Sequence, residues 1–340
     1  MPNQVDECAK DFVEAALKVK EKYLAKIVVN SFDLDLFDVC VSVQTPADSQ
    51  ETSLLASAFP RSRLTESAPW NLVVIDGSAG FFPPNRGWDS RFHQPTGQLR
   101  ITQESIRVAV DPIVRTVWVM DKPTKTVLVF VPSLRELPRW WFATPLRLGL
   151  SWITDVAGYE FVHGAVIGRD GAGILLAGPS GVGKSTLSLR LALSGWDFLS
   201  DDFFLVDGLI AASVYQRAKL NADSLKELGF EAMAEFSDSS CLTKSIIDVT
   251  TLGRVASVPR LTIRGVAVSS LAPFSGVHSV PQSKAFMELA SSTLAGLQGG
   301  SPQSFARLAR VISGSRLGQF GVMGPIPEIS SALEVAMLTA

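Results

Sequence analysis

The spacing of apolar residues divides the chain into two parts that meet near residue 157. Residues 5–25 carry apolar side chains at helical intervals and predict an amphipathic helix. We interpret it as a helix docked on its own domain, with a dimerisation helix as the alternative. Apolar runs and alternations typical of strands follow at 26–30, 36–43, 71–76, 105–110, 114–120 and 126–131. Residues 134–155 are helical again, so residues 1–157 are predicted to form an α+β domain with an antiparallel sheet.

The second part, residues 158–340, alternates apolar strands with helices and predicts an α/β domain. Residues 159–168 form a strand that turns into the apolar run 173–177, and such a hairpin is unusual in the parallel sheets of most nucleotide hydrolases. Helices are predicted at 186–193, 223–236, 284–298, 304–312 and 329–338, and strands at 196–206, 215–220, 261–268 and 319–323.

Two stretches lack a regular pattern. Residues 78–99 are rich in glycine, proline and aromatic residues and predict an irregular loop, either packed on the surface or serving as a lid or peptide-docking surface. Residues 237–244 are polar and predict a mobile loop.

Composition narrows the function classes. The 340 residues are 46% hydrophobic and 19% charged with a net charge of −2, so no global field favours nucleic acid or an anionic membrane. The three cysteines are far apart and indicate reduced thiols in a cytoplasmic compartment. The N-terminus is charged where a signal peptide would be apolar. The most apolar long stretch, 140–156, contains proline, arginine and aspartate, and suits a buried helix better than a membrane span.

The strongest motif is a glycine-rich loop between a predicted strand and a predicted helix. Residues 178–185 match the phosphate-binding pattern G-x-x-x-x-G-K-[ST]. Backbone N–H groups and the positive end of the helix dipole would converge on a phosphate there. Lys184 would reach the β- and γ-phosphates of ATP, and the Ser185 hydroxyl would bind Mg²⁺. The candidate nucleotide-binding residues are Gly178, Pro179, Ser180, Gly181, Val182, Gly183, Lys184, Ser185 and Thr186.

A pair of carboxylates follows one helix after this loop. In an extended strand Asp201 and Asp202 would point to opposite sides and have different roles. One would bind Mg²⁺ and the other would take a proton from an attacking hydroxyl, although the pattern does not say which does which. A solvated turn is the alternative. His163, in the strand ahead of the loop, is either a core histidine or a catalytic residue near the phosphates.

Three cations complete the set of candidates. Phosphoryl transfer is accelerated by positive charge placed where negative charge spreads over the phosphoryl oxygens. Arg217, Lys219 and Lys244 are candidate contacts to the phosphates or the acceptor, with ordinary surface cations as the alternative.

The order of these motifs resembles a known family. His163-Gly164, the loop at 178–185 and Ser200-Asp201-Asp202 together resemble the catalytic domain of HPr kinase/phosphorylase and the broader HPr kinase-like serine kinases, including those of peptide-biosynthesis clusters. The resemblance is strong over about 159–206, diffuse from there to about 335, and absent before about 100. It implies a P-loop core similar to phosphoenolpyruvate carboxykinase, with His163 against the phosphates or the acceptor.

The chain also departs from that family. Thr186 stands where the bifunctional enzymes typically have glutamate, and residues 252–254 and 263–265 match the downstream glycine-rich signature poorly. The chain therefore resembles the HPr kinase-like serine kinases more than the bifunctional HPr kinase/phosphorylase.

The leading hypothesis is an ATP- and Mg²⁺-dependent kinase that phosphorylates a serine-type hydroxyl of a peptide or protein. Residues 1–157 would help to bind this acceptor. No nucleic acid or membrane partner is expected, and a homo-oligomer is possible. The alternatives are a small-molecule alcohol kinase of the same fold and a nucleotide-binding regulatory ATPase without a phosphoryl acceptor.

Overall fold

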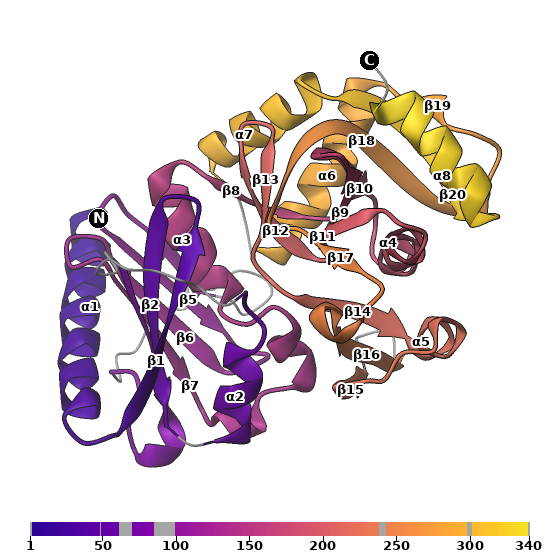
Figure 1. The fold of residues 1–340 in the computed structure, drawn as a ribbon. Coiled ribbons are helices and arrows are strands. Elements are labelled where there is room, and N and C mark those ends of the chain that lie inside the picture. Colours follow the sequence, from indigo (N-terminus) through magenta and orange to yellow (C-terminus); the bar gives the residue numbers. More distant parts are fainter. Residues whose placement is uncertain are drawn as a thin grey trace. The chain divides into compact units, whose positions relative to one another are not determined.

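The computed structural model describes residues 2–47, 49–60, 70–84, 99–237, 243–297 and 301–338 (Figure 1). The chain divides into two compact units, which are described separately. Unit 1 comprises residues 1–142 and 146–153, and unit 2 comprises residues 143–145 and 154–340. The predicted domain boundary at 157/158 lies close to this division.

Unit 1 is built on a seven-stranded sheet with the order β1-β2-β3-β7-β6-β5-β4. Its helices and strands are α1 (Pro2–Leu24), β1 (Val29–Leu36), β2 (Val39–Pro46), α2 (Gln50–Ala56), β3 (Trp70–Asp76), β4 (Leu99–Thr102), β5 (Ile106–Asp111), β6 (Thr116–Asp121), β7 (Thr126–Val131) and α3 (Arg147–Ala157). The expectation of a purely antiparallel sheet is wrong, because β3 pairs in parallel with both β2 and β7. Parallel neighbours cannot be joined by a tight hairpin, and here residues 47–69 lie between β2 and β3, while β4, β5 and β6 come between β3 and β7 in the chain.

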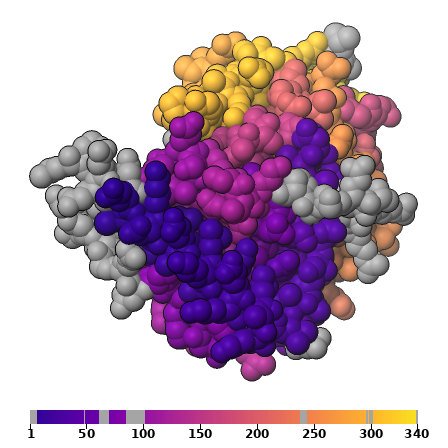
Figure 2. Space-filling model, turned by 90° about the vertical axis from the view of Figure 1, so that its left-hand side faces the viewer, coloured from indigo at the N-terminus to yellow at the C-terminus, as the bar shows by residue number. Residues whose placement is uncertain are grey.

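Helices cover both faces of this sheet. The apolar side of α1, including Phe12 and Tyr23, is buried in one cluster with Ile75 and Leu128 of the strands. The polar side of α1 is exposed, in the indigo region of Figure 2. The structure therefore agrees with a helix docked on its own domain.

Unit 2 contains a ten-stranded mixed sheet and a separate three-stranded sheet. The large sheet has the order β17-β11-β9-β10-β18-β13-β12-β8, with β20 beside β18 and β19 beside β20, and the small sheet has the order β14-β16-β15. The strands are β8 (Glu160–His163), β9 (Ala165–Arg169), β10 (Ala172–Ala177), β11 (Asp197–Ser200), β12 (Phe203–Asp207), β13 (Ile210–Ser213), β14 (Arg217–Asn221), β15 (Ala234–Ser237), β16 (Thr243–Asp248), β17 (Ala256–Ser257), β18 (Arg260–Pro273), β19 (His278–Ser279) and β20 (Arg316–Met323). The helices are α4 (Lys184–Leu193), α5 (Ala222–Leu228), α6 (Gln282–Gly296), α7 (Pro302–Ser313) and α8 (Ile326–Leu333), and residues Glu334–Leu338 continue as a π-helix.

The central strand β10 is apolar along its length because helices pack on both of its sides. Leu175 faces one cluster with α6 and α7, and Ile174 and Leu176 face another with α4 and α8. All three side chains are fully buried, and each such burial stabilises the fold by about 1.5–3 kcal/mol. This packing holds fixed the strand that leads into the glycine-rich loop.

Three sequence-based expectations for unit 2 are wrong, including the single strand at 196–206, which is divided at Asp201 and Asp202 into β11 and β12. The strand predicted at 159–168 is divided at Gly164 into β8, which pairs with β12, and β9, which pairs with β10 and β11. The helix predicted at 223–236 ends at Gly229, which takes a left-handed φ of 67°, and the chain continues into β15. A glycine in this conformation is a common end of a helix.

Parts of the two predicted loops, 85–98 and 238–242, lie outside the described residues. Within the part of the chain that is described, no helix has the length and hydropathy needed to cross a membrane.

Candidate functional site

The glycine-rich loop connects β10 to α4, as the sequence pattern predicted. Gly183 caps the start of α4 with a φ of 93°. Gly178 follows β10 with a φ of 140°, and a Cβ atom there would lie 2.8 Å from the carbonyl oxygen of Ser269 on β18. A residue with a side chain would therefore be strained and would collide with the neighbouring backbone. The glycines of the motif are required by this tight turn.

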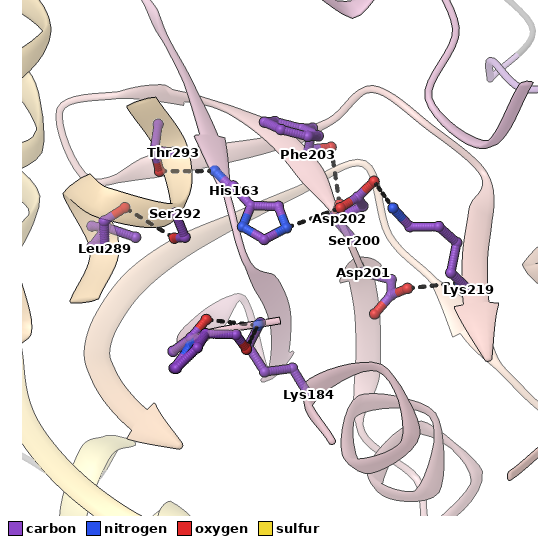
Figure 3. Close-up of polar contacts among 12 residues, drawn as sticks. His163, Lys184, Ser200, Asp201, Asp202, Phe203, Lys219, Leu289, Ser292 and Thr293 are labelled. Carbon is purple, nitrogen blue, oxygen red and sulfur yellow. Dashed lines mark hydrogen bonds and ion pairs between the residues drawn. The ribbon is translucent and has the colours of Figure 1, made fainter. Parts of the chain in front are cut away.

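Lys184 lies at the start of α4 and is buried, with 7% of its surface exposed. Its Nζ donates hydrogen bonds to the carbonyl oxygens of Gly178 (2.8 Å) and Pro179 (2.9 Å) (Figure 3). Burial lowers the pKa of Lys184, and the nearby carboxylates of Asp201 and Asp202 act in the opposite direction. The lysine is thus held against the loop, within electrostatic range of both aspartates.

The two aspartates lie in the connection between β11 and β12, and not within one extended strand as expected. The Ser200 hydroxyl donates to the carbonyl oxygen of Phe203 at 3.0 Å across this connection. The backbone N–H of Gly164 donates to the carbonyl oxygen of Asp202 at 2.8 Å. Asp201 and Asp202 are both buried, with 4% and 6% of their surface exposed. A solvated turn is therefore excluded, since buried carboxylates need partners.

Asp202 is held between the side chains of His163 and Lys219 (Figure 3). His163 Nε2 lies 3.0 Å from Oδ1, and Lys219 Nζ lies 2.6 Å from Oδ2. Burial by itself raises the pKa of Asp202, but Lys219 and His163 outweigh it and hold the pKa well below its usual range. Asp202 is consequently a carboxylate with a fixed orientation.

His163 is the last residue of β8, directly opposite Phe203 of β12. Its ring centroid lies 5.0 Å from that of Phe203, and its backbone N–H donates to Thr293 Oγ1 on α6 at 3.1 Å. Strand pairing, the aromatic neighbour and the helix together aim the imidazole at Asp202. His163 is thus the partner of a buried carboxylate and not an isolated core histidine.

Asp201 has different surroundings. Its Oδ2 accepts a hydrogen bond from the backbone N–H of Lys219 at 2.9 Å. Its other oxygen, Oδ1, is also buried. Burial raises the pKa of Asp201, and the nearby Ser185 hydroxyl of the loop lowers it. The Ser185 hydroxyl of the loop therefore lies beside the Asp201 carboxylate.

These residues suit a magnesium ion bound together with phosphates. Among the residues that the structure describes, no three His, Cys, Asp or Glu side chains form a metal cluster. Mg²⁺ is usually held by one or two carboxylates together with substrate phosphates. The buried carboxylate of Asp201, with the Ser185 hydroxyl beside it, fits such a site.

The other predicted cations differ in position. Lys219 contacts Asp202 directly, and both Lys219 and Lys244 lower the pKa of Lys184. Arg217 pairs in register with Asp248 of β16, is buried, and has a pKa lowered to about 10 by burial, which Asp248 opposes. Lys219 and Lys244 are thus near Lys184, and Arg217 has a carboxylate neighbour of its own.

The rest of the loop is more exposed. Pro179, Ser180 and Gly181 are exposed, Val182 is half-buried, and the Thr186 hydroxyl lies 2.8 Å from that of Ser224 on α5. Sequence reasoning missed Ser224 and Thr293. No motif marks Thr293, which is 130 residues from its partner His163.

The fold and the site together define an α/β protein in which a glycine-rich loop faces two buried aspartates. No protein-family model matches the chain. The chain is 24% identical, over 195 residues, to the HPr kinase/phosphorylase of Mycoplasmopsis pulmonis (strain UAB CTIP). This alignment spans 55% of the chain and 60% of the length of that relative. The resemblance to the HPr kinase-like family is therefore confirmed, at low identity.

A solved structure gives a further match. It is the HPr(Ser) kinase/phosphatase from Coxiella burnetii, which is 16% identical and matches with a TM-score of 0.25. The match covers 52% of this chain and 93% of that one.

Proposed function

We propose that this protein is a cytoplasmic, ATP- and Mg²⁺-dependent P-loop kinase that transfers the γ-phosphoryl group to a serine-type hydroxyl of a peptide or protein. The observation that carries the proposal is the meeting of the loop residues Lys184 and Ser185 with Asp201 and Asp202. The phosphate-binding groups then lie beside two carboxylates, one of which could bind a metal ion while the other accepts a proton. Phosphoryl transfer requires these groups in one place.

Asp201 is the proposed metal ligand, together with Ser185. Its buried carboxylate lies beside the Ser185 hydroxyl, so the two groups could face one cation together. When bound, Mg²⁺ would neutralise negative charge on the β- and γ-phosphate oxygens. Lys184 would leave the loop carbonyls and donate to the same phosphates.

Asp202 is the proposed base that accepts the proton of the acceptor hydroxyl. His163 and Lys219 orient it and keep it ionised. A carboxylate with a low pKa is a weak base, but phosphoryl transfer has a loose transition state in which positioning matters more than proton removal. The hydroxyl oxygen forms a bond to the γ-phosphorus, the bond to the bridging oxygen of ADP breaks, and the proton passes to Asp202.

A transfer assay tests the proposal. The protein is incubated with γ-labelled ATP, Mg²⁺ and serine-containing peptides, and in parallel with free serine and simple alcohols. We expect label on a peptide, and loss of that label in Lys184→Ala but not in Lys226→Ala, which changes an exposed lysine on α5. Label on a small alcohol alone would replace the peptide acceptor by a small molecule. Free phosphate alone, or unreacted ATP, would refute the kinase.

A further inference from the structure

The small sheet, with the order β14-β16-β15, has two faces with different surroundings. On one face, Ala218 and Leu220 of β14 pack with Leu189 of α4. Side chains alternate along a strand, so the residues between them point to the opposite face. Lys219 lies on this second face, and its Nζ is 2.6 Å from Oδ2 of Asp202 (Figure 3). The second face of the small sheet is therefore the one beside the proposed base.

Strand pairing places another lysine on the same face. Lys219 lies opposite Ile246 of β16, and Lys244 precedes Ile246 by two residues. The two lysines are thus diagonal neighbours in the sheet, a relation in which residues are about 7–8 Å apart. Both also lower the pKa of Lys184 in the glycine-rich loop. Lys244 therefore lies within electrostatic range of the phosphate-binding residues.

The two ends of this face differ in accessibility. At one end Arg217 is buried, and Ile246 in the middle is buried as well. At the other end Lys244 and its cross-strand neighbour Phe236 of β15 are both half-buried. The side chain of Lys219 is 28% exposed. The accessible end of the face thus presents two lysines and an aromatic ring.

We propose that this end of the face binds an acidic side chain of the acceptor peptide, and that Lys244 is the residue that selects it. The inference rests on the proposed function, because it takes Asp202 to receive the proton of the acceptor serine. A serine hydroxyl at Asp202 lies beside Lys219, and Lys244 is the next cation along the face. Its positive charge is complementary to a carboxylate on the bound peptide.

The spacing of the lysines sets the position of the acidic residue in the peptide. An extended peptide rises about 3.3 Å per residue, so two residues span about 7 Å. Residues two apart in an extended chain also point to the same side. When the serine is directed at Asp202, an aspartate or glutamate two positions before or after it can therefore reach Lys244.

The alternative partner of Lys244 is the triphosphate of ATP. In phosphoryl transfer the attacking and leaving oxygens lie roughly in line, so the acceptor approaches the γ-phosphorus from the side opposite ADP. Lys244 shares its face with Lys219, which contacts the proposed base on the acceptor side. Lys184, at the start of α4, is the lysine that belongs to the phosphate-binding loop. The position of Lys244 therefore suits the acceptor better than the nucleotide.

A degenerate peptide library tests this selection. Each peptide is blocked at both ends and carries one central serine, and the flanking positions are randomised without serine, threonine or tyrosine. The library is incubated with ATP and Mg²⁺, and the phosphorylated peptides are sequenced to give the enrichment of each residue type at each position. The variants are Lys244→Ala and Lys244→Glu, and Lys226→Ala, at an exposed position on α5, is the matched control. Calorimetry gives the affinity of each protein for ATP·Mg²⁺, and thermal melting confirms that each is folded.

We expect the parent and Lys226→Ala to enrich aspartate and glutamate about fivefold over asparagine and glutamine two positions from the serine. This preference corresponds to about 1 kcal/mol, as for an accessible ion pair. Lys244→Ala should abolish the enrichment and bind ATP·Mg²⁺ as the parent does. Lys244→Glu should replace it by an enrichment of lysine and arginine at the same position.

Three other results would contradict the inference. Absence of acidic enrichment in the parent, or its persistence in Lys244→Ala, would overturn the acceptor site and leave the proposed kinase intact. Weaker ATP·Mg²⁺ binding in Lys244→Ala with unchanged peptide selection would assign Lys244 to the nucleotide. A library that receives no phosphate from the parent would refute the proposed peptide kinase itself.

Discussion

Asp201 and Asp202 are adjacent in sequence, yet their surroundings differ sharply. Burial raises the pKa of both carboxyl groups, but Lys219 and His163 outweigh it at Asp202 and hold that pKa below its usual range. A shift in opposite directions is typical of neighbouring groups with different chemical tasks. The proposed roles, Asp201 as metal ligand and Asp202 as base, rest on the Ser185 hydroxyl beside Asp201 and on the orientation of Asp202 by His163 and Lys219, and the sequence pattern left them open.

Replacing each carboxylate by its amide tests the two roles. We expect Asp202→Asn to lower kcat by about 10²–10⁴-fold, as for loss of a general base, while ATP·Mg²⁺ affinity stays close to that of the parent. Asp201→Asn should instead raise the Mg²⁺ concentration needed for half-maximal activity. Steady-state kinetics over a Mg²⁺ titration and calorimetric ATP binding provide both readings.

Asp207→Asn, an exposed carboxylate at the end of β12, is the control and should behave as the parent. Parent rates in both Asp201→Asn and Asp202→Asn would show that neither carboxylate has a chemical role. An exchange of the two phenotypes would reverse the assignment.

At the scale of elements, the site depends on β10 and its neighbours. The strand is buried on both faces, so the loop starts from a fixed position beside β18. The small sheet that carries Lys219 is fixed in a similar way, because Ala218 and Leu220 of β14 pack with Leu189 of α4. Alternation along β14 then directs Lys219 to the other face, where Asp202 lies.

Gly178→Ala tests the close approach of the loop to β18. The added Cβ would lie 2.8 Å from the carbonyl oxygen of Ser269 at a φ of 140°, so the loop must move. We expect a loss of stability of about 1–3 kcal/mol from the backbone strain, and weaker tripolyphosphate binding. Chemical denaturation and calorimetry measure the two effects.

Gly171→Ala is the matched control, because Gly171 also has a positive φ (77°) but nothing within 4 Å of the added Cβ. It should lose stability without losing tripolyphosphate affinity. Equal phosphate affinities in Gly178→Ala and the parent would show that this contact does not shape the loop.

At the scale of the whole molecule, a partly buried ion cluster in unit 2 joins residues that are far apart in sequence. Arg307 of α7 lies 2.6 Å from Asp155 and 3.3 Å from Glu160 of β8. Burial raises the pKa of Glu160, whereas Ser304 and Arg307 lower it. The cluster therefore anchors α7 beside the strand that ends at His163.

Arg307→Met should destabilise the protein by about 3 kcal/mol, because it leaves buried Glu160 without its cation. Thermal and urea unfolding give the change in the free energy of unfolding. Arg310→Met, at an exposed position on the same helix, should stay within about 0.5 kcal/mol of the parent. If the two variants were equally stable, the cluster would contribute nothing to the fold.

The sequence by itself determined the local features of the proposed kinase. The apolar run before residue 178, the glycines and the helical spacing after Lys184 depend on near neighbours, and so the loop between β10 and α4 could be predicted. The docked helix α1 followed from its apolar periodicity. These features are readable because burial and tight turns restrict residue type locally.

Only the tertiary structure decided which distant residues meet. β3 pairs in parallel with β2 and β7, to which no tight turn joins it. The predicted strand at 159–168 is divided at Gly164 because its two halves pair with different strands. The contact of His163 with Asp202 arises because β8 ends beside the connection between β11 and β12, and the contact of Lys219 arises because β14 of the small sheet passes the same connection. No local sequence pattern encodes these contacts, because they result from the packing of distant strands. They give the two aspartates different surroundings.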